Sequence, residues 1–404
     1  MRAAPTGPPC PEYRERRTES DKMTHSKSAS RATLVATLLA LALTAALSGG
    51  CAHRTAPTVE GGWPLPGETP KNIVLMIGDG MGAAHVTAAM VEAGSLNMER
   101  LPLGGLMSTH AENSFLTDSA ASGTAMATGH KTNNGMVSVT PDGAPLRTVI
   151  EHAEEKGLST GLVATCSITH ATPAVFVAHA RSRDNHTEIA RQIADSEVDV
   201  LFGGGAMYFL PRTGSGGIRD DAADLLSAMR ARMPVALTTE EFAALPDGDA
   251  AAALLYPEHP PRASQRSVSL TDMTKRAIEI LSRDDDGFFL MVEGSQIDWA
   301  GHENDQEWLI EETLDFDRAV GAAMDFAEMD GETLVIVTAD HECGGYLLFD
   351  ASLESRKVTW SEFGCDTHSA TIVPLLAYGP GGAGLGGIMD NTTLGRTLID
   401  YVRR

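Results

Sequence analysis

Short apolar runs alternate with stretches of helical periodicity from Lys71 to the end of the chain. The apolar runs predict strands at residues 72–77, 159–164, 198–202, 288–292, 333–337 and 371–377. The periodic stretches predict helices at about residues 83–93, 119–128, 146–156, 186–195, 270–282 and 306–328. Such alternation is typical of βαβ units around a buried parallel sheet. The pattern therefore predicts an α/β fold.

The predicted elements fall into a single domain. Neither an internal repeat nor a second domain-sized change of composition interrupts residues 71–404. Residues 204–268 are rich in Gly, Pro and Asp, and we expect them to form loops and a small subdomain on the same core. The glycine-rich run 379–387 is expected to be a terminal loop that precedes no strong helix.

A basic segment and an apolar run precede this domain. Lys27 and Arg31 lie before the run from Leu34 to Leu47, and small residues follow the run. This order is typical of a secretory signal, and the run is too short to span a bilayer. We expect residues 1–50 to comprise an extension and a signal peptide. Met23 is an alternative start, because it places the basic residues directly before the apolar run.

The end of the predicted signal, Leu47-Ser-Gly-Gly-Cys51, resembles a bacterial lipobox, although Ser48 stands where a larger aliphatic residue is usual. Two outcomes stay open, a lipid anchor at Cys51 or a soluble exported protein. Residues 51–70 contain several prolines and are expected to be a tether. The protein is thus expected in the periplasm, or at the outer membrane as a lipoprotein.

The amino-acid composition limits the classes of molecule that the protein is expected to bind. The 404 residues carry a formal net charge of -23, which excludes nucleic acid as an expected partner because phosphate backbones require basic surfaces. A negative protein that acts on phosphates needs local positive charge from an arginine or from bound metals. Three cysteines lie in the predicted domain, residues 71–404, and export permits a disulfide. The expected pair is Cys343–Cys365, which leaves Cys166 free.

Polar side chains follow four of the predicted strands at their carboxyl ends, where open α/β sheets bind their ligands. They are carboxylate, imidazole and hydroxyl groups: Asp79, His170, Thr172, Glu293, Asp298, His302, Asp340 and His341. His368 lies just before the final predicted strand. Oxygen and imidazole donors without thiolate suit zinc, magnesium or manganese.

Each part of this set has an ordinary structural interpretation, since an Asp–His pair four residues apart often begins a solvated helix. Their joint position at one sheet edge favours a metal site, because so many carboxylates would not be buried together without cations. Asp298 and His302 share a face if their segment is helical. Asp79, Thr172 and Glu293 offer only oxygen and suit a harder ion such as magnesium.

The stretch from Leu116 to Gly129 predicts a loop that turns directly into a helix, with Asp118 and Ser119 at its start. A serine at a helix start lies near free backbone N–H groups and the positive end of the helix dipole. That environment suits an alkoxide or a phosphoserine. The alternative is an ordinary N-terminal serine on a packing helix.

From Asn72 to its end, the chain resembles the alkaline phosphatases. Four segments carry the resemblance: Ile-Gly-Asp79-Gly-Met-Gly, Thr-Asp118-Ser119-Ala-Ala-Ser-Gly-Thr-Ala, Val-Glu293-Gly-Ser-Gln-Ile-Asp298-Trp-Ala-Gly-His302 and Thr-Ala-Asp340-His341-Glu. The resemblance implies a three-layer sandwich with a central, mostly parallel sheet flanked by helices. It also implies two zinc ions and one magnesium ion.

The resemblance assigns a role to each site residue. Ser119 is the implied nucleophile that becomes phosphoserine, and Arg183 is the implied phosphate clamp, with Arg181 as the neighbouring competitor. Asp118 is expected to steer Arg183 and not to bind metal. The implied ligands are Asp298, His302 and His368 for one zinc; Asp79, Asp340 and His341 for the other; and Asp79, Thr172 and Glu293 for magnesium.

Two residues depart from some branches of the family. His170 and Trp299, which we place in the substrate-binding region, stand where other branches have Asp and Lys. These changes put in doubt how the third metal is held. We expect His170 to contact the metal ligands and not the metal itself. Between His341 and His368 there is no room for the large insertion that some relatives use at their dimer interface, so a homodimer is expected by analogy alone. The other histidines, His259 among them, match no ligand position.

These features predict an exported hydrolase of small-molecule phosphate monoesters. One alternative is a phosphodiesterase or sulfatase-like relative with the same fold, although diesterases usually carry Thr as the nucleophile. Another is a non-catalytic lipoprotein that binds phosphate or metal. Ser119 argues against the second alternative, because a binding protein has no use for a nucleophile.

Overall fold

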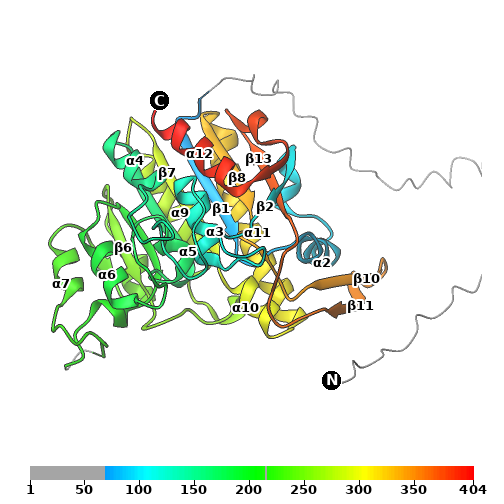
Figure 1. Ribbon diagram of the computed structural model, residues 1–404, viewed down its shortest axis with the longest axis horizontal. Helices are drawn as coiled ribbons and strands as arrows, with labels where there is room; N and C mark the ends of the chain where they lie inside the picture. Colours follow the sequence, from blue (N-terminus) through cyan, green and yellow to red (C-terminus); the bar gives the residue numbers. More distant parts are fainter. Residues whose placement is uncertain (1–68, 214–215) are drawn as a thin grey trace, which may run out of the picture. The chain divides into compact units, whose positions relative to one another are not determined.

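The computed structural model describes residues 69–213 and 216–404, and its centre is a ten-stranded sheet (Figure 1). The strand order is β14-β2-β13-β8-β1-β7-β3-β4-β6-β5. Their bounds are β1 Asn72–Gly78, β2 Leu103–Ser108, β3 Ser159–Ser167, β4 Val200–Gly204, β5 Val235–Ala236, β6 Ala251–Leu254, β7 Phe288–Gly294, β8 Thr333–Thr338, β13 Val373–Tyr378 and β14 Gly387–Asp390. The predicted leader, and the predicted tether up to residue 68, lie outside the described residues.

Two pairs of strands stand apart from this sheet. β9 Glu342–Cys343 pairs with β12 His368–Ser369, and β10 Tyr346–Ser352 pairs with β11 Lys357–Phe363. Figure 1 shows the β10–β11 hairpin extending away from the central sheet, and both strands of the hairpin contact α2.

Helices cover both faces of the sheet. The α-helices are α2 Ala83–Ala93, α3 Ser119–Thr128, α4 Val149–Glu155, α5 Ala171–Ala174, α6 His186–Asp195, α7 Leu225–Arg230, α8 Thr239–Ala243, α9 Leu270–Leu281, α10 Gln296–His302, α11 Gln306–Asp330 and α12 Asn391–Val402. Short 3-10 turns are η1 Asn97–Arg100, η2 Ala206–Phe209, η3 Ala263–Gln265 and η4 Gly382–Leu385. α9 and α11 pack together on one side, while α3, α4, α5 and α12 contact one another on the other.

This arrangement confirms the predicted three-layer α/β fold. The central strands β1, β7 and β8 are parallel and buried along their whole length, which explains why their sequences are continuously apolar. Apolar side chains of these strands form one core with the helices on both faces. The carboxyl ends of the same strands carry the polar residues of the candidate site.

The last predicted strand is shifted and reversed. β13 begins at Val373 and runs antiparallel to both β8 and β2. The edge strand β14 and its neighbour β2 were not predicted from the sequence, because both are short and contain glycine. Residues 204–268 also extend the main sheet, since β5 and β6 lie there and pair next to β4.

Two expectations were wrong. The glycine-rich run 379–387 does precede a strong helix, because Asp390 caps α12 by accepting a hydrogen bond from Thr392 N. The predicted Cys343–Cys365 disulfide is not formed, and both thiols are free. Cys365 Sγ instead donates to the carbonyl of Thr367 at 3.1 Å. No helix among residues 69–213 and 216–404 is long and apolar enough to cross a membrane.

Candidate active site

Ser119 is the first residue of α3, a helix that is buried along its whole length. Asp118 caps this helix, because its Oδ1 accepts a hydrogen bond from Ala121 N at 2.9 Å. The small residues of α3 allow close packing on α12, where a side chain at Gly395 would lie 2.3 Å from the Ala125 carbonyl oxygen. The loop and helix predicted from the sequence are thus present, and Ser119 is held at a buried helix start.

Ser119 faces a cluster of three buried side chains, Asp79, Asp340 and His341. Its Oγ lies 3.2 Å from His341 Nε2. The same nitrogen lies 3.4 Å from Asp79 Oδ1 and 3.2 Å from Asp340 Oδ2. One imidazole nitrogen therefore meets two carboxylates and the hydroxyl.

The turn after β1 brings this cluster close to its neighbour. Gly80 has φ 75°, and a Cβ there would lie 2.7 Å from the Cα of Asp298. Gly80 N also donates to Asp340 Oδ1 at 3.1 Å. Only glycine adopts this conformation and allows this approach without strain.

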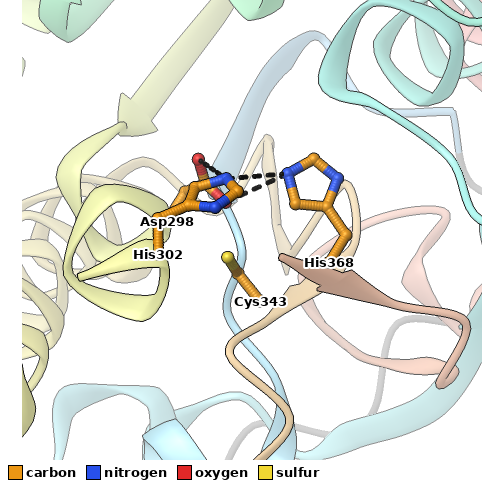
Figure 2. A group of neighbouring side chains, drawn as sticks. All are labelled: Asp298, His302, Cys343 and His368. Atoms are coloured by element: carbon orange, nitrogen blue, oxygen red, sulfur yellow. Dashed lines mark hydrogen bonds and ion pairs between the residues drawn. The ribbon is translucent and has the colours of Figure 1, made fainter. Parts of the chain in front are cut away.

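A second cluster joins Asp298, His302 and His368 (Figure 2). The Nε2 atoms of the two histidines lie 3.4 Å from opposite oxygens of Asp298 and 3.2 Å from each other. Their Nδ1 atoms lie 2.8 Å and 2.7 Å from the carbonyl oxygens of Asp366 and Thr117, respectively. An Nδ1–H that donates to a carbonyl leaves Nε2 free to bind a metal, so the backbone sets both rings for ligation.

Cys343 belongs to this second cluster and was missed in the sequence. Figure 2 shows its sulfur pointing toward Asp298 and His302. The candidate ligand atoms of Asp298, His302, His368 and Cys343 all lie within 4.8 Å of one another. Burial, followed by the charge of Asp298, raises the pKa of the Cys343 thiol. Residue 343 reaches the site because β9 pairs it with His368, a contact with no local signal in the sequence.

Glu293 and Thr172 add buried oxygen atoms, and the charge of Glu293 acts on Asp79. Thr172 Oγ1, Glu293 Oε1 and both Asp79 carboxylate oxygens are buried without a hydrogen-bond donor among the described residues. Glu293 is also grouped with His170 and Cys166, and Cys166 Sγ donates to Glu293 Oε2 at 3.4 Å. Cys166 is a second nearby thiol that the sequence did not indicate.

The buried carboxylates are strongly perturbed. Burial, with the charges of Asp340, Asp298 and Glu293, raises the pKa of Asp79 well above its usual range. Burial raises the pKa of Glu293 to about 7, and burial with the charge of Asp298 raises the pKa of Asp340 to about 6. The pKa of His341 is lowered by burial and by nearby His368 and Arg183. These raised pKa values show that the buried carboxylates lack nearby positive charge to compensate them.

Arg183 is the arginine at this site. Its Nη1 donates to Asp118 Oδ2 at 3.0 Å, and its Nη2 lies 3.3 Å from His170 Nε2. Burial lowers the pKa of its guanidinium, but the charge of Asp118 and the hydrogen bond to it, followed by the charges of Asp79 and Asp298, raise that pKa above the usual value. Arg181 is exposed and donates to the carbonyl of Asp142, away from the site.

His170 and Trp299 form one wall beside Arg183. Their ring centroids are 6.0 Å apart in an edge-on arrangement, and His259 lies 4.8 Å from Trp299 in a similar arrangement. Burial, followed by the charge of Arg183, lowers the pKa of His170 well below its usual value. A neutral His170 can therefore accept a hydrogen bond from Arg183.

The alkaline phosphatase family model matches residues 70–354. The chain belongs to the alkaline phosphatase family. It is 40% identical over 296 residues to alkaline phosphatase 4 of Bacillus subtilis. The aligned region covers 69% of this chain and 62% of the Bacillus protein. It is also 32% identical over 408 residues to the alkaline phosphatase of Escherichia coli, and this aligned region covers 83% of this chain and 86% of that protein. The chain thus spans less than two thirds of the Bacillus relative.

The fold agrees with solved structures of the alkaline phosphatase family. The enzyme from the Antarctic bacterium TAB5 has a TM-score of 0.76 at 37% identity, over 83% of this chain and 98% of that chain. The Thermus thermophilus enzyme has a TM-score of 0.76 at 26% identity, over 84% and 93%. A variant of the Antarctic enzyme is known with Mg bound in its M3 site. The family and the fold predicted from the sequence are confirmed.

Proposed function

We propose that this member of the family hydrolyses phosphate monoesters through a phosphoserine formed on Ser119. The observation that carries this proposal is the position of the Ser119 hydroxyl, 3.2 Å from His341 Nε2 at the start of a buried helix. Arg183 lies on the other side of Asp118, with its guanidinium held at 3.0 Å. Nucleophile and phosphate clamp thus share one anchoring carboxylate.

The donor set fits three metal ions. Buried oxygens of Asp79, Thr172, Glu293, Asp298 and Asp340 have no hydrogen-bond donor among the described residues. Buried carboxylates without cations are costly, so these oxygens are suited to metal. Zinc fits the two clusters with imidazoles, Asp298/His302/His368 and Asp79/Asp340/His341. Magnesium fits the all-oxygen set of Asp79, Thr172 and Glu293.

When bound, such ions supply positive charge that stabilises an alkoxide and the oxygens of a transferring phosphoryl group. The chain's own groups then position the reaction. Ser119 Oγ attacks phosphorus, the bond from phosphorus to the alcohol oxygen breaks, and the alcohol leaves with a proton. Arg183 holds phosphoryl oxygens through its parallel N–H groups, and Asp118 fixes the guanidinium. Water then takes the phosphoryl group from Ser119 and releases phosphate.

The proposal includes the setting of the enzyme. Its substrates are small-molecule phosphate monoesters, and the net charge of -23 disfavours nucleic acid. We propose that the protein acts after export, either as a soluble periplasmic protein or with a lipid anchor at Cys51. A homodimer is proposed by analogy alone. The mass of the mature protein tests the anchor, because lipidation adds acyl chains to Cys51.

The decisive experiment compares monoester, diester and sulfate-ester hydrolysis by the purified mature protein, with metal analysis of the same sample. We expect monoester hydrolysis with two zinc ions and one magnesium ion, loss of activity in EDTA and recovery with both metals. Ser119→Ala should lose at least about 10³-fold in turnover and still bind phosphate. Preferred diester or sulfate hydrolysis, or normal turnover by Ser119→Ala, would overturn the proposal.

A further inference from the structure

A cavity of about 550 Å³ opens directly beside the site. His302 lines it, and this residue belongs to the second metal-ligand cluster. His170, which contacts Arg183, lines it too. The cavity therefore begins at the phosphate-binding region and leads away from it.

The leaving alcohol should lie on this side. In an in-line displacement the attacking and leaving oxygens lie on opposite sides of phosphorus. Ser119 contacts His341 of the first cluster, so the leaving oxygen faces the second cluster, which contains His302. The rest of the substrate then extends from His302 into the cavity.

The walls of the cavity are flat and held in place. Trp299 is fixed edge-on by His259, at 4.8 Å between ring centroids. The other indole, Trp308, is tied through Nε1 to Glu312 Oε1 at 3.1 Å. The Arg262 guanidinium carbon lies 4.1 Å from the centroid of the Trp308 ring. Fixed indole and guanidinium planes are surfaces on which aromatic rings stack.

The charges favour an uncharged occupant. Arg262 is paired with Asp305 at 3.1 Å, which offsets its positive charge. Glu303 adds an exposed carboxylate to the lining. A second anionic group on the substrate would be repelled by the Glu303 carboxylate. Arg262 would not offset this repulsion, because it is already paired with Asp305.

We propose that this cavity binds the alcohol portion of the substrate and selects flat, uncharged aromatic groups, with nucleoside monophosphates as the representative class. The inference rests on the proposed function, because it takes the phosphate to lie between Ser119 and Arg183. Trp308 is the specificity-determining residue, since its indole lies off the metal-ligand clusters and still lines the cavity.

The test compares adenosine 5′-monophosphate with 1-O-methyl ribose 5-phosphate, which has the same primary ester and lacks the base. We expect the wild-type protein to have a KM for the nucleotide lower by about 10-fold, the size of one stacking contact. Trp308→Ala should reduce that preference to less than about 3-fold, with kcat on the methyl riboside and inhibition by inorganic phosphate unchanged. Trp308→Phe should keep most of the preference, because it keeps a flat ring.

The matched control is Trp360→Ala, since Trp360 is an exposed indole on β11 that stacks on Phe349 and does not line the cavity. Adenosine should inhibit the wild-type protein competitively, which gives a second measurement independent of the variants. Equal KM values for the two esters in the wild-type protein would overturn the cavity proposal and leave the monoesterase proposal standing. Failure to hydrolyse either ester would overturn both.

Discussion

Asp118 Oδ2 accepts a hydrogen bond from Arg183 Nη1 at 3.0 Å. The other oxygen of the same carboxylate caps the helix that begins at Ser119, and Gly135 N donates to Asp118 Oδ2 at 3.0 Å. A single side chain thus aligns the helix of the proposed nucleophile with the proposed phosphate clamp. Its two functions can be separated, because helix capping needs an oxygen and the hold on Arg183 needs a negative charge.

Asp118→Asn should keep the cap and lose the hold on Arg183. An amide oxygen can accept from Ala121 N, while the amide N–H groups face the Arg183 and Gly135 donors. We expect the inhibition constant for inorganic phosphate to rise by about 10-fold with little change in melting temperature. Asp118→Ala should show the same loss of phosphate affinity and lose about 1 kcal/mol of stability with the cap. Wild-type phosphate inhibition in both variants would contradict this division of roles.

The two neighbouring arginines should behave differently. Arg183→Ala removes the guanidinium beside Asp118, and we expect the inhibition constant for phosphate to rise by about 100-fold, the effect of losing a bidentate charged contact. Arg181→Ala is the matched control, because its guanidinium donates to the Asp142 carbonyl and is exposed. Competitive inhibition and thermal melting of both variants check the prediction. A larger effect at Arg181 would transfer the clamp to that residue.

Local signals explain what could be predicted from the sequence. The helix 119–128 has the predicted bounds, because Asp118 caps its start and Gly129, with φ 72°, ends it. The strands that begin at Asn72, Ser159 and Phe288 were also predicted at their first residues, since both faces of these strands are buried and each contains an apolar run. Because these strands are parallel, the polar residues that follow them lie at the same edge of the sheet.

Non-local pairing explains what could not be predicted. Cys343 reaches Asp298 through the two-residue pairing of β9 with β12, and two residues carry no periodicity. Arg262 and Trp308 line one cavity although they come from separate segments, and no motif joins them. The edge strand β14 and its neighbour β2 carry no clear strand signal in the sequence, because both are short and include glycine.

The Cys343 thiol should position Asp298 for metal. Its sulfur lies in the second cluster, within 4.8 Å of an Asp298 carboxylate oxygen, where a donated hydrogen bond can orient that carboxylate. Partners behind a metal ligand typically contribute 10- to 100-fold in metal affinity, so we expect Cys343→Ala to weaken zinc binding by about 10-fold or more. Cys343→Ser should keep near wild-type affinity, because a hydroxyl can donate to the same carboxylate.

Zinc competition with a chelator, read as metal content and not as activity, measures this effect. Cys365→Ala is the control, since its thiol donates to the Thr367 carbonyl and is not in the cluster. Equal zinc affinity of the Cys343→Ala and wild-type proteins would contradict the positioning role. A loss in Cys343→Ser as large as in Cys343→Ala would show that sulfur itself is needed.

Glu154 should make the stability of the fold depend on pH. It lies on α4, away from the metal clusters, and burial together with the charge of Glu197 raises its pKa to about 7. A glutamate in an unfolded chain has a pKa of about 4.3. Between these two values the folded protein keeps a proton that the unfolded chain has released, so stability falls as pH rises through this window.

Glu154→Gln removes this titration and keeps a polar side chain next to Thr160 Oγ1, which donates to Glu154 at 3.4 Å. We expect the variant to be more stable than the wild-type protein at pH 8, with the difference shrinking toward pH 4 as the wild-type carboxyl becomes protonated. Urea unfolding at several pH values measures the difference in free energy of unfolding. Glu155→Gln is the control, because that neighbouring carboxylate is exposed and pairs with Arg147. A Glu154→Gln protein whose stability relative to wild type does not change with pH would show that Glu154 is ionised in the fold at neutral pH.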